Sequence, residues 1–361
     1  MIVQSIELIK FRNYQSERVV LQPGSTLIHG NNGQGKTNLL EAVFLLLQGY
    51  SFRTKKILDC LPWDSKEAIL RLEANKGGTP LSIGIRLQKN GGKEVSINGQ
   101  RHKKMSVLLG LWPVVAIGPG DIELSQGAPA VRRRFLDSSI CQFDLEYLEA
   151  LRKYQHVLKQ RNQLLKDFHS SKEATWTVYT EQLAQLGAIL IAKRKAWVAE
   201  IEPIVARFYG EIAQGKEAIS LSYGDKWEGE QVDFQNQLIA GMQVKKIPEL
   251  TLGTTLSGPH KDDLSISLNQ QSLREFGSQG QQRSTALALK LAFADWSKSK
   301  LKKEPLILLD DVFAELDPGR KSALVKYALS FPQVFLTTPL QESEGIPTDH
   351  HLKIEAGKVT F

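Results

Sequence analysis

Eight consecutive residues near the N-terminus have the composition of a phosphate-binding loop. They are Gly30, Asn31, Asn32, Gly33, Gln34, Gly35, Lys36 and Thr37. The run matches the pattern GxxxxGK[ST], in which glycines let backbone N–H groups turn inward around phosphates. The lysine then neutralises the β- and γ-phosphates, and the threonine hydroxyl ligates Mg²⁺. The run therefore predicts a site for ATP and Mg²⁺, with Lys36 as a catalytic cation and Thr37 as a metal ligand.

A second candidate lies roughly 270 residues further along the chain, where an apolar run at 306–309 ends in Asp310 and Asp311. A buried strand that delivers a carboxylate at its end is the Walker B arrangement. We expect Asp310 to hold Mg²⁺, directly or through water, and Asp311 to polarise the attacking water. Two carboxylates that cap the next turn are the structural alternative. One nucleotide site would therefore use both ends of the chain.

A third candidate opens an Ala/Leu-rich helix predicted at 281–299. The run Ser278-Gln279-Gly280-Gln281-Gln282-Arg283 resembles the LSGGQ signature of ABC-type ATPases at Ser278, Gly280 and Gln281, and departs from it at Gly277 and Gln279. A serine and a glycine at a helix N-terminus can clamp a second phosphate, although an ordinary N-cap has the same composition. Residues 314–317, Ala-Glu-Leu-Asp, follow Asp311 at the spacing of the D-loop of that family.

The elements that must position these motifs divide the chain into an α/β head and a helical insertion. Strand patterns occur at 2–9, 25–29, 81–85 and 112–117, and an apolar helix is predicted at 36–47. Residues 131–214 have helical periodicity with a turn at 169–171, which predicts a hairpin with arms of about 30 residues, each roughly 45 Å long. We therefore predict an ABC-type ATPase head from residues 1–129 and 248–361, with an inserted helical, coiled-coil-like lobe at 130–247.

Several stretches across nearly the whole chain resemble the RecF family of bacterial recombination mediators, whose heads are similar to those of SMC and Rad50 proteins. They are 11–14 (FRNY), 30–37, 132–137 (RRRFLD), 257–263 (SGPHKDD), 276–283 and 309–317. The runs GPHKDD and QGQQR are specific to that family rather than to ABC proteins at large. In ABC proteins the signature of one subunit closes on the nucleotide of the other, so the resemblance implies an ATP-dependent homodimer.

The resemblance also implies a function in DNA replication and gap repair. It implies binding of single-stranded, double-stranded and gapped DNA, recombinase loading, and RecR and RecO proteins as partners. Two departures from the ABC pattern limit what the resemblance implies about catalysis. No histidine lies near Thr337-Thr338-Pro339, where the ABC switch histidine would fall, and Asp311 is one methylene shorter than the usual glutamate. We therefore expect weak, DNA-stimulated ATP hydrolysis that acts as a switch. The Q-loop candidate is the region 118–121.

Composition agrees with an anionic partner. The net charge is +7, and the two cysteines, Cys60 and Cys141, indicate reduced thiols in a cytoplasmic protein. Neither a membrane-spanning run nor a secretion signal is expected. Basic residues gather at 151–166 and 193–195 on the predicted arms, and at Lys55-Lys56 and 101–104 on the head. We expect the chain to bind the phosphate backbone of DNA without reading the bases, and we favour the head surface as the contact.

Two other function classes share part of this pattern. An ABC transporter ATPase subunit has the same motif order, but the long separation of the two ATP motifs and the helical lobe argue against it. A P-loop kinase of a small metabolite would not need a signature and a D-loop. His260 lies beside two carboxylates, and a hydrogen-bonded structural role is favoured over a catalytic one.

Overall fold

The computed structural model describes residues 1–213, 217–313, 316, 318–339 and 347–360. They form two compact units, Met1–Asp121 with Leu287–Phe361, and Ile122–Ala286. The predicted head and lobe differ from these units mainly at residues 248–286, which lie in the second unit because strand β10 (Leu264–Leu268) pairs with β9 (Ile219–Tyr223). Compactness alone does not define which part acts as a head, so the predicted division stays a prediction.

A mainly parallel sheet forms one layer of the first unit, in the order β15-β14-β3-β13-β12-β8. Its strands are β3 (Gly24–His29), β8 (Val114–Ile117), β12 (Leu306–Asp310), β13 (Gln333–Thr338), β14 (His350–Glu355) and β15 (Lys358–Thr360). Only β15 is antiparallel to its neighbour. The strands β12 and β13 are almost wholly buried, which explains why they have near-continuous apolar sequences.

An antiparallel sheet forms the second layer, in the order β2-β1-β4-β5-β6-β7. Its strands are β1 (Ile2–Phe11), β2 (Tyr14–Val20), β4 (Glu67–Lys76), β5 (Thr79–Gln88), β6 (Lys93–Ile97) and β7 (Gln100–His102). The strands predicted at 2–9, 25–29 and 81–85 are therefore confirmed, and the hairpin turn between β5 and β6 falls at residues 89–92.

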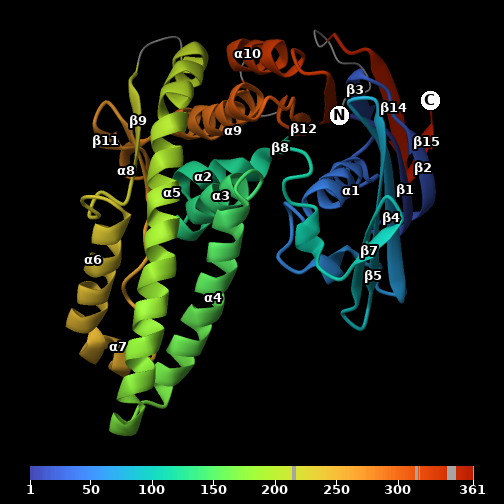
Figure 1. Cartoon of the computed structure of the whole chain (residues 1–361). Coiled ribbons are helices and arrows are strands. Elements are labelled where there is room, and N and C mark those ends of the chain that lie inside the picture. Colours follow the sequence, from blue (N-terminus) through green and yellow to red (C-terminus); the bar gives the residue numbers. More distant parts are fainter. Residues whose placement is uncertain (214–216, 314–315, 317, 340–346, 361) are drawn as a thin grey trace. The chain divides into compact units, whose positions relative to one another are not determined.

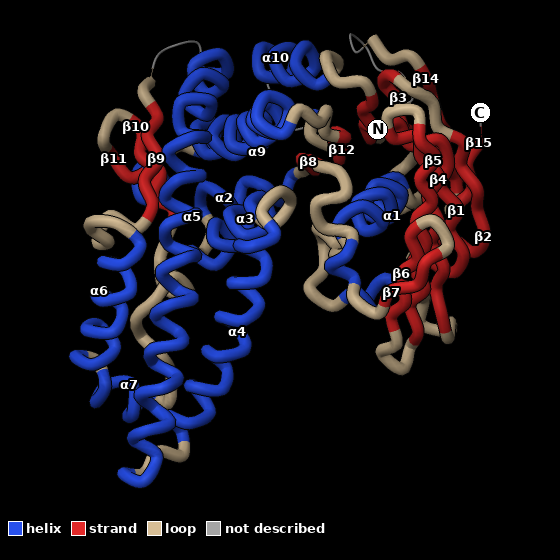
Figure 2. The backbone as a smooth tube through the Cα atoms, in the orientation of Figure 1, coloured by secondary structure: helices blue, strands red, loops and turns tan. Residues whose placement is uncertain are grey.

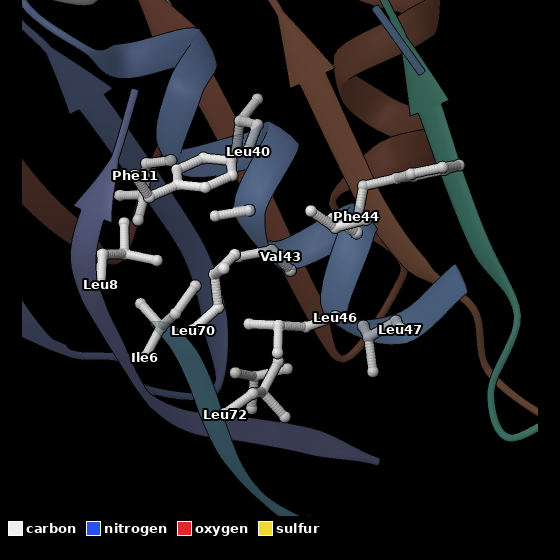
Figure 3. Close-up of a cluster of buried hydrophobic side chains, with 14 of the residues drawn as sticks. Ile6, Leu8, Phe11, Leu40, Val43, Phe44, Leu46, Leu47, Leu70 and Leu72 are labelled. Carbon is white, nitrogen blue, oxygen red and sulfur yellow. The ribbon is translucent and has the colours of Figure 1, made fainter. Parts of the chain in front are cut away.

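Helix α1 (Lys36–Gln48) packs on strands of both sheets, which is why its residues from 39 to 48 are all buried and mostly apolar. Figure 3 shows Leu40, Val43 and Leu46 of this helix beside the inward side chains of the antiparallel sheet. Ile6, Leu8, Leu70 and Leu72 on that sheet are fully buried. The helix that follows the glycine-rich loop is thus fixed in the main core of this unit.

The second unit is mainly helical (Figure 2). Its longer helices are α3 (Pro129–Ile140), α4 (Leu145–Lys166), α5 (Glu173–Ala213) and α6 (Gln231–Val244), followed by α7 (Lys246–Leu252). Shorter elements are α2 (Glu123–Gln126), α8 (Leu273–Phe276) and a small sheet in the order β11-β10-β9, in which β11 is Gln271–Ser272. Helix α9 (Gln279–Leu301) begins in this unit and ends in the first, where α10 (Pro318–Ala328) follows.

The predicted helical hairpin is present, but its equal arms are wrong. Helices α4 and α5 run side by side (Figure 1), with 22 and 41 residues, or about 33 and 62 Å at 1.5 Å per residue. The first arm is short because Asp144 caps a new helix, its carboxylate accepting the N–H of Tyr147 at 2.8 Å. The second arm continues through Pro203. Helix α6 lies within the helical lobe predicted at 130–247, and α7 extends just past its end. None of the helices among the described residues is long and apolar enough to span a membrane.

Candidate nucleotide site

The glycine-rich loop lies at the carboxyl edge of the parallel sheet. It joins β3 to α1, and the neighbouring strands β13, β12 and β8 end at the same edge. Ligands of open α/β sheets bind at this edge, because loops there converge and helix N-termini point toward it. The sequence therefore places the loop where an anionic ligand can bind.

Two glycines of the loop are required by close packing. Gly30 has φ +148°, and a Cβ there would lie 2.3 Å from the carbonyl oxygen of Ile354. Gly35 has φ +121°, and a Cβ there would lie 2.8 Å from Nδ2 of Asn13. Gly33 also has a positive φ but faces open space. The loop therefore packs closely against other residues of the first unit at Gly30 and Gly35, and it is open at Gly33.

Lys36 lies folded against this loop. Its Nζ donates to the carbonyl oxygens of Gly30 at 2.6 Å and Asn31 at 2.9 Å. Burial lowers the pKa of Lys36, while the nearby carboxylates of Asp311 and Asp310 raise it. An ammonium group that is short of solvent and held by two neutral carbonyls is suited to exchange them for phosphate oxygens.

The two predicted metal ligands are in direct contact. The hydroxyl of Thr37 donates to Oδ1 of Asp310 at 2.8 Å, and the hydroxyl of Thr337 donates to the same oxygen at 2.9 Å. Burial raises the pKa of Asp310, although these two hydrogen bonds lower it. Residues 273 positions apart in the sequence therefore meet at one point.

These donors fit Mg²⁺. A hydroxyl and a carboxylate are hard oxygen ligands, and Mg²⁺ typically binds proteins through one or two carboxylates while it keeps several waters. A cation would also compensate the burial that raises the pKa of Asp310. Among the described residues no group of three or more histidine, cysteine or acidic side chains could hold a metal ion by itself. The arrangement suits a metal shared with a phosphate ligand.

Asp311 has a left-handed backbone, with φ +51°. Its N–H donates to the hydroxyl of Thr337 at 2.9 Å, so Thr337 holds both acidic residues. Aspartate tolerates this conformation better than most residues do. Thr337 lies near the position at which the ABC switch histidine would fall. It is a site residue that the sequence did not identify.

Asn13 and Tyr14 also support the loop without having been predicted to do so. Asn13 donates to the carbonyl oxygen of Gln34 at 2.7 Å and accepts from the side chain of Asn38 at 2.8 Å. The hydroxyl of Tyr14 donates to the carbonyl oxygen of Gly35 at 2.9 Å. The run 11–14 is one of the stretches that carry the family resemblance. This resemblance was the signal in the sequence that could have identified Asn13 and Tyr14.

Beside them lies an ion-pair network centred on a buried carboxylate. Arg12 donates to both oxygens of Glu41, at 2.9 and 2.8 Å, and Arg53 lies 3.3 Å from one of them. Burial opposes the charge of Glu41, but hydrogen bonds from Arg12 and Ser51 and the charges of both arginines bring its pKa below the usual value. Glu41 is therefore ionised and fixes Arg12 beside α1.

The predicted signature residues open α9 as a capping box. The N–H of Gln281 donates to Oγ of Ser278 at 3.3 Å, and Oε1 of Gln281 accepts the N–H of Ser278 at 2.6 Å. Ser278 and Gln279 are exposed, and Phe276 just before them is 70% exposed. The structure therefore shows an ordinary N-cap at Ser278. Because Ser278 is exposed, it can also contact another molecule.

The structure says less about the predicted D-loop and Q-loop residues. Of the D-loop candidate, Ala314, Glu315 and Asp317 lie outside the described residues. In the Q-loop candidate region 118–121, the carboxylate of Asp121 accepts the N–H of Gly118 at 2.8 Å and pairs with Lys290 at 2.9 Å. The Q-loop assignment stays a prediction.

Comparisons with known proteins identify the family of the chain. The family model of the RecF/RecN/SMC N terminal domain matches residues 2–343. The DNA replication and repair protein RecF of Lachnoclostridium phytofermentans is 36% identical, covering 99% of both chains. The chain belongs to the RecF family. Its relatives bear the name of DNA replication and repair proteins, and the alternative of a transporter subunit is excluded.

Solved structures place the fold in the same RecF family. The structure of the recombination mediator protein RecF-ATP in the RecFOR pathway has a TM-score of 0.93 and 31% identity, covering 99% of this chain and 97% of that one. An Smc head domain with an extended coiled coil from Pyrococcus furiosus has a TM-score of 0.57 at 17% identity, which indicates fold alone. The predicted α/β fold with a helical insertion is confirmed.

The stretch 257–263, which carries the RecF resemblance, is a structural hub of the second unit. Both ring nitrogens of His260 are hydrogen-bonded, Nδ1 with the Tyr154 hydroxyl at 2.6 Å and Nε2 with the Thr255 carbonyl oxygen at 3.0 Å. Asp263 pairs with the buried Arg132 at 2.6 Å, and the carbonyl oxygen of Pro259 accepts from Arg194 at 2.8 Å. The favoured structural role of His260 agrees with these contacts.

Two arginines of the predicted basic arms are buried, and a neighbouring lysine is paired with a carboxylate. Arg161 is fully buried, where it pairs with the equally buried Glu249 at 2.8 Å. Arg194 is buried against Asp137 at 2.6 Å, and Lys193 pairs with Asp144 at 2.6 Å. A run of charges on a helix does not reveal which of its faces is buried.

Exposed basic residues remain on both units. On the second unit, Arg152, Lys153 and Lys159 are exposed on α4, and the first two line a groove of about 620 Å³ between α4 and α5. On the first unit, Lys55, Lys56, Lys103 and Lys104 are exposed. A hollow of about 500 Å³ at β5–β7 is lined by Arg86, Lys93, Arg101 and Lys103, among others.

Proposed function

We propose that this RecF-family chain is an ATP-gated DNA-binding protein of replication and recombinational gap repair. ATP with Mg²⁺ binds at residues 30–37, and slow hydrolysis resets the protein. The observation that carries the proposal is the 2.8 Å hydrogen bond between Thr37 and Asp310. It unites the glycine-rich loop and the acidic strand end in one site, and the solved relative described as RecF-ATP supports ATP as the ligand.

Each residue has a proposed role that follows from its contacts. Backbone N–H groups of residues 30–35 cradle the phosphates, and Lys36 exchanges its carbonyl partners for β- and γ-phosphate oxygens. Thr37 and Asp310 would hold Mg²⁺, which would neutralise charge on the phosphates. Asp311 orients the attacking water, with its backbone fixed by Thr337.

A second copy of the chain completes the site. Ser278, Gly280 and Gln281 form the N-terminus of a 23-residue helix, and Ser278 is exposed. A helix N-terminus favours an anion through the dipole of the helix. We propose that these residues contact the γ-phosphate held by the partner copy, so that ATP drives dimerisation and ADP does not.

DNA binding is proposed to depend on the dimer. The net charge of +7 and the exposed lysines at 55, 56, 103 and 104 supply a phosphate-binding surface on the first unit. The solved relative belongs to the RecFOR pathway, and we propose RecR and RecO proteins as partners of this chain also.

The composite site is tested by mixing two inactive variants. Lys36→Met removes the phosphate-facing cation, and Ser278→Arg blocks the signature but leaves the loop intact. Light scattering and ATPase assays of each variant alone should give monomers without turnover. The mixture can assemble one intact site, so dimers and part of the activity should return. A mixture that stays monomeric and inactive, with both variants folded, would refute the two-subunit site.

The nucleotide gate is tested by the salt dependence of DNA binding. On duplex DNA the slope of log K against log salt is about −0.9 for each phosphate neutralised. A dimer touches more phosphates than a monomer, so the slope should be steeper with ATP than with ADP. Neutralising Lys55, Lys56, Lys103 and Lys104 together should flatten it. Equal slopes with the two nucleotides would contradict the gate even if DNA binding were strong.

A further inference from the structure

Trp63 differs from every other tryptophan of the chain. All six tryptophans lie within the described residues. Trp63 is 97% exposed, whereas Trp112, Trp176, Trp197, Trp227 and Trp296 are at most 8% exposed. Tryptophan is a large apolar side chain that is usually well buried, so an indole left almost entirely in water calls for an explanation.

The backbone from which the Trp63 indole projects is held by hydrogen bonds. The N–H of Ser65 donates to the carbonyl oxygen of Pro62 at 3.1 Å, which closes a turn with Trp63 at its corner. Nζ of Lys89, on the loop after β5, donates to the carbonyl oxygen of Trp63 at 2.9 Å. Ser65 is buried and anchors the far side of the turn. A rigid aromatic ring loses little conformational entropy when a ligand stacks on it.

Lysines lie on both sides of this turn in the sequence. Exposed Lys55 and Lys56 precede it on the same segment, and exposed Lys66 follows it directly. The N–H of Lys89 donates to the carbonyl oxygen of Lys66 at 2.9 Å, so these two lysines are neighbours beside the turn. Residues 55–66 hold three lysines against Asp59 and Asp64, so three positive and two negative charges leave a net charge of +1.

We propose that Trp63 is a stacking platform for an unpaired DNA base at the edge of a gap. Aromatic rings stack on unpaired bases while neighbouring lysines neutralise the backbone, a combination that accepts any base and requires single-stranded DNA. Duplex DNA keeps its bases paired and offers only phosphates. Trp63 thus gives this chain a preference for gapped over continuous duplex DNA. The inference rests on the proposed DNA-binding function and adds a residue that distinguishes the two forms.

The burial of the other tryptophans makes a direct test possible. Acrylamide quenches exposed indoles, so in the full-length protein it reports chiefly on Trp63. With ATP present, a duplex with a 12-nucleotide gap should protect this fluorescence from acrylamide, and a blunt duplex of equal length should not. Trp63→Phe should remove the quenchable signal while it keeps most of the gap affinity.

Affinity measurements with matched variants complete the test. Stacking of one base is worth about 5- to 150-fold in affinity, so Trp63→Ala should weaken gapped-DNA binding by at least about fivefold and leave blunt-duplex binding unchanged. Val20→Ala, at another exposed apolar residue of the same unit, should change neither. Equal loss on both DNAs, or no protection by the gap, would overturn the inference. Protection of Trp63 fluorescence from acrylamide by a RecR protein alone would also overturn the inference, because the turn would then be a protein-docking site. If the unaltered protein bound neither DNA, the proposed function itself would fail, and the inference with it.

Discussion

The carboxylate of Glu217 accepts a hydrogen bond from the side-chain amide of Gln281 at 2.6 Å. Its other oxygen accepts from the Tyr209 hydroxyl near the end of α5 at 2.5 Å. Gln281 in turn completes the capping box with Ser278. A chain of polar contacts therefore runs from the long helix to the proposed signature, and it fixes the rotamer of Gln281.

Glu217→Ala should weaken ATP-driven dimerisation without weakening ATP binding. A typical side-chain hydrogen bond contributes about 1 kcal/mol, or roughly fivefold in an equilibrium constant. We expect a dimer affinity about fivefold lower by analytical ultracentrifugation, and an unchanged ATP affinity by calorimetry. Glu217→Gln, which keeps an acceptor oxygen, should recover part of the loss. Glu211→Ala, at an exposed position on α5, should have no effect. An unchanged dimer affinity in Glu217→Ala would limit this contact to local capping.

Asp311→Asn should separate hydrolysis from binding. Asparagine adopts the left-handed backbone as readily as aspartate, so the fold should persist, but it cannot accept a proton from water. Positioned acid–base groups contribute about 10²–10⁴ in rate. We expect ATP turnover at least tenfold slower at unchanged ATP affinity, with a longer-lived dimer. A variant with normal turnover would show that Asp311 is structural and would direct attention to Glu315 and Asp317.

Neutralising Arg161 should destabilise the protein, whereas neutralising its exposed neighbours should not. Arg161→Met strands the buried carboxylate of Glu249, and breaking a buried ion pair typically costs about 3–5 kcal/mol. Lys153→Gln with Lys159→Gln should change the free energy of unfolding by less than about 0.5 kcal/mol. Urea titrations distinguish the two. Adding Glu249→Leu to Arg161→Met should restore much of the stability, and no such recovery would contradict the ion-pair explanation.

His260 should make the protein less stable in mild acid. Burial lowers the pKa of His260 from 6.5 to about 4. The unfolded chain therefore binds a proton between these values that the folded chain does not, so the free energy of unfolding falls as pH drops from about 6.5 toward 4. The contribution is about 3 kcal/mol. Urea titrations at pH 7 and pH 5 should show a smaller pH dependence for His260→Gln than for the unaltered protein. An identical dependence would exclude His260 as its source.

The sequence predicts the nucleotide site better than the lobe, for physical reasons. The glycine-rich loop needs specific residues at fixed spacing, and the strand before Asp310 is buried on both faces, so both leave local signals. Helices α6 and α7 leave a weaker signal because their buried residues are few, Phe234, Leu238 and Met242 on α6. Burial of Arg161 depends on Glu249, 88 positions away, and nothing local to α4 could reveal it. The role of Thr337 is likewise set by Asp310 on the neighbouring strand.

The position of β3 in its sheet has a consequence for synthesis of the chain. This strand, which leads into the glycine-rich loop, lies between β13 and β14, and both of these follow residue 332. At about 5–20 residues per second, a ribosome needs roughly 15–60 s to make the intervening chain. The antiparallel sheet, complete by residue 102, can cover one side of α1 during that time. The side of α1 that packs on β12 and β13 stays uncovered by those strands until residues 306–338 are made, so an apolar helix face is exposed for most of synthesis.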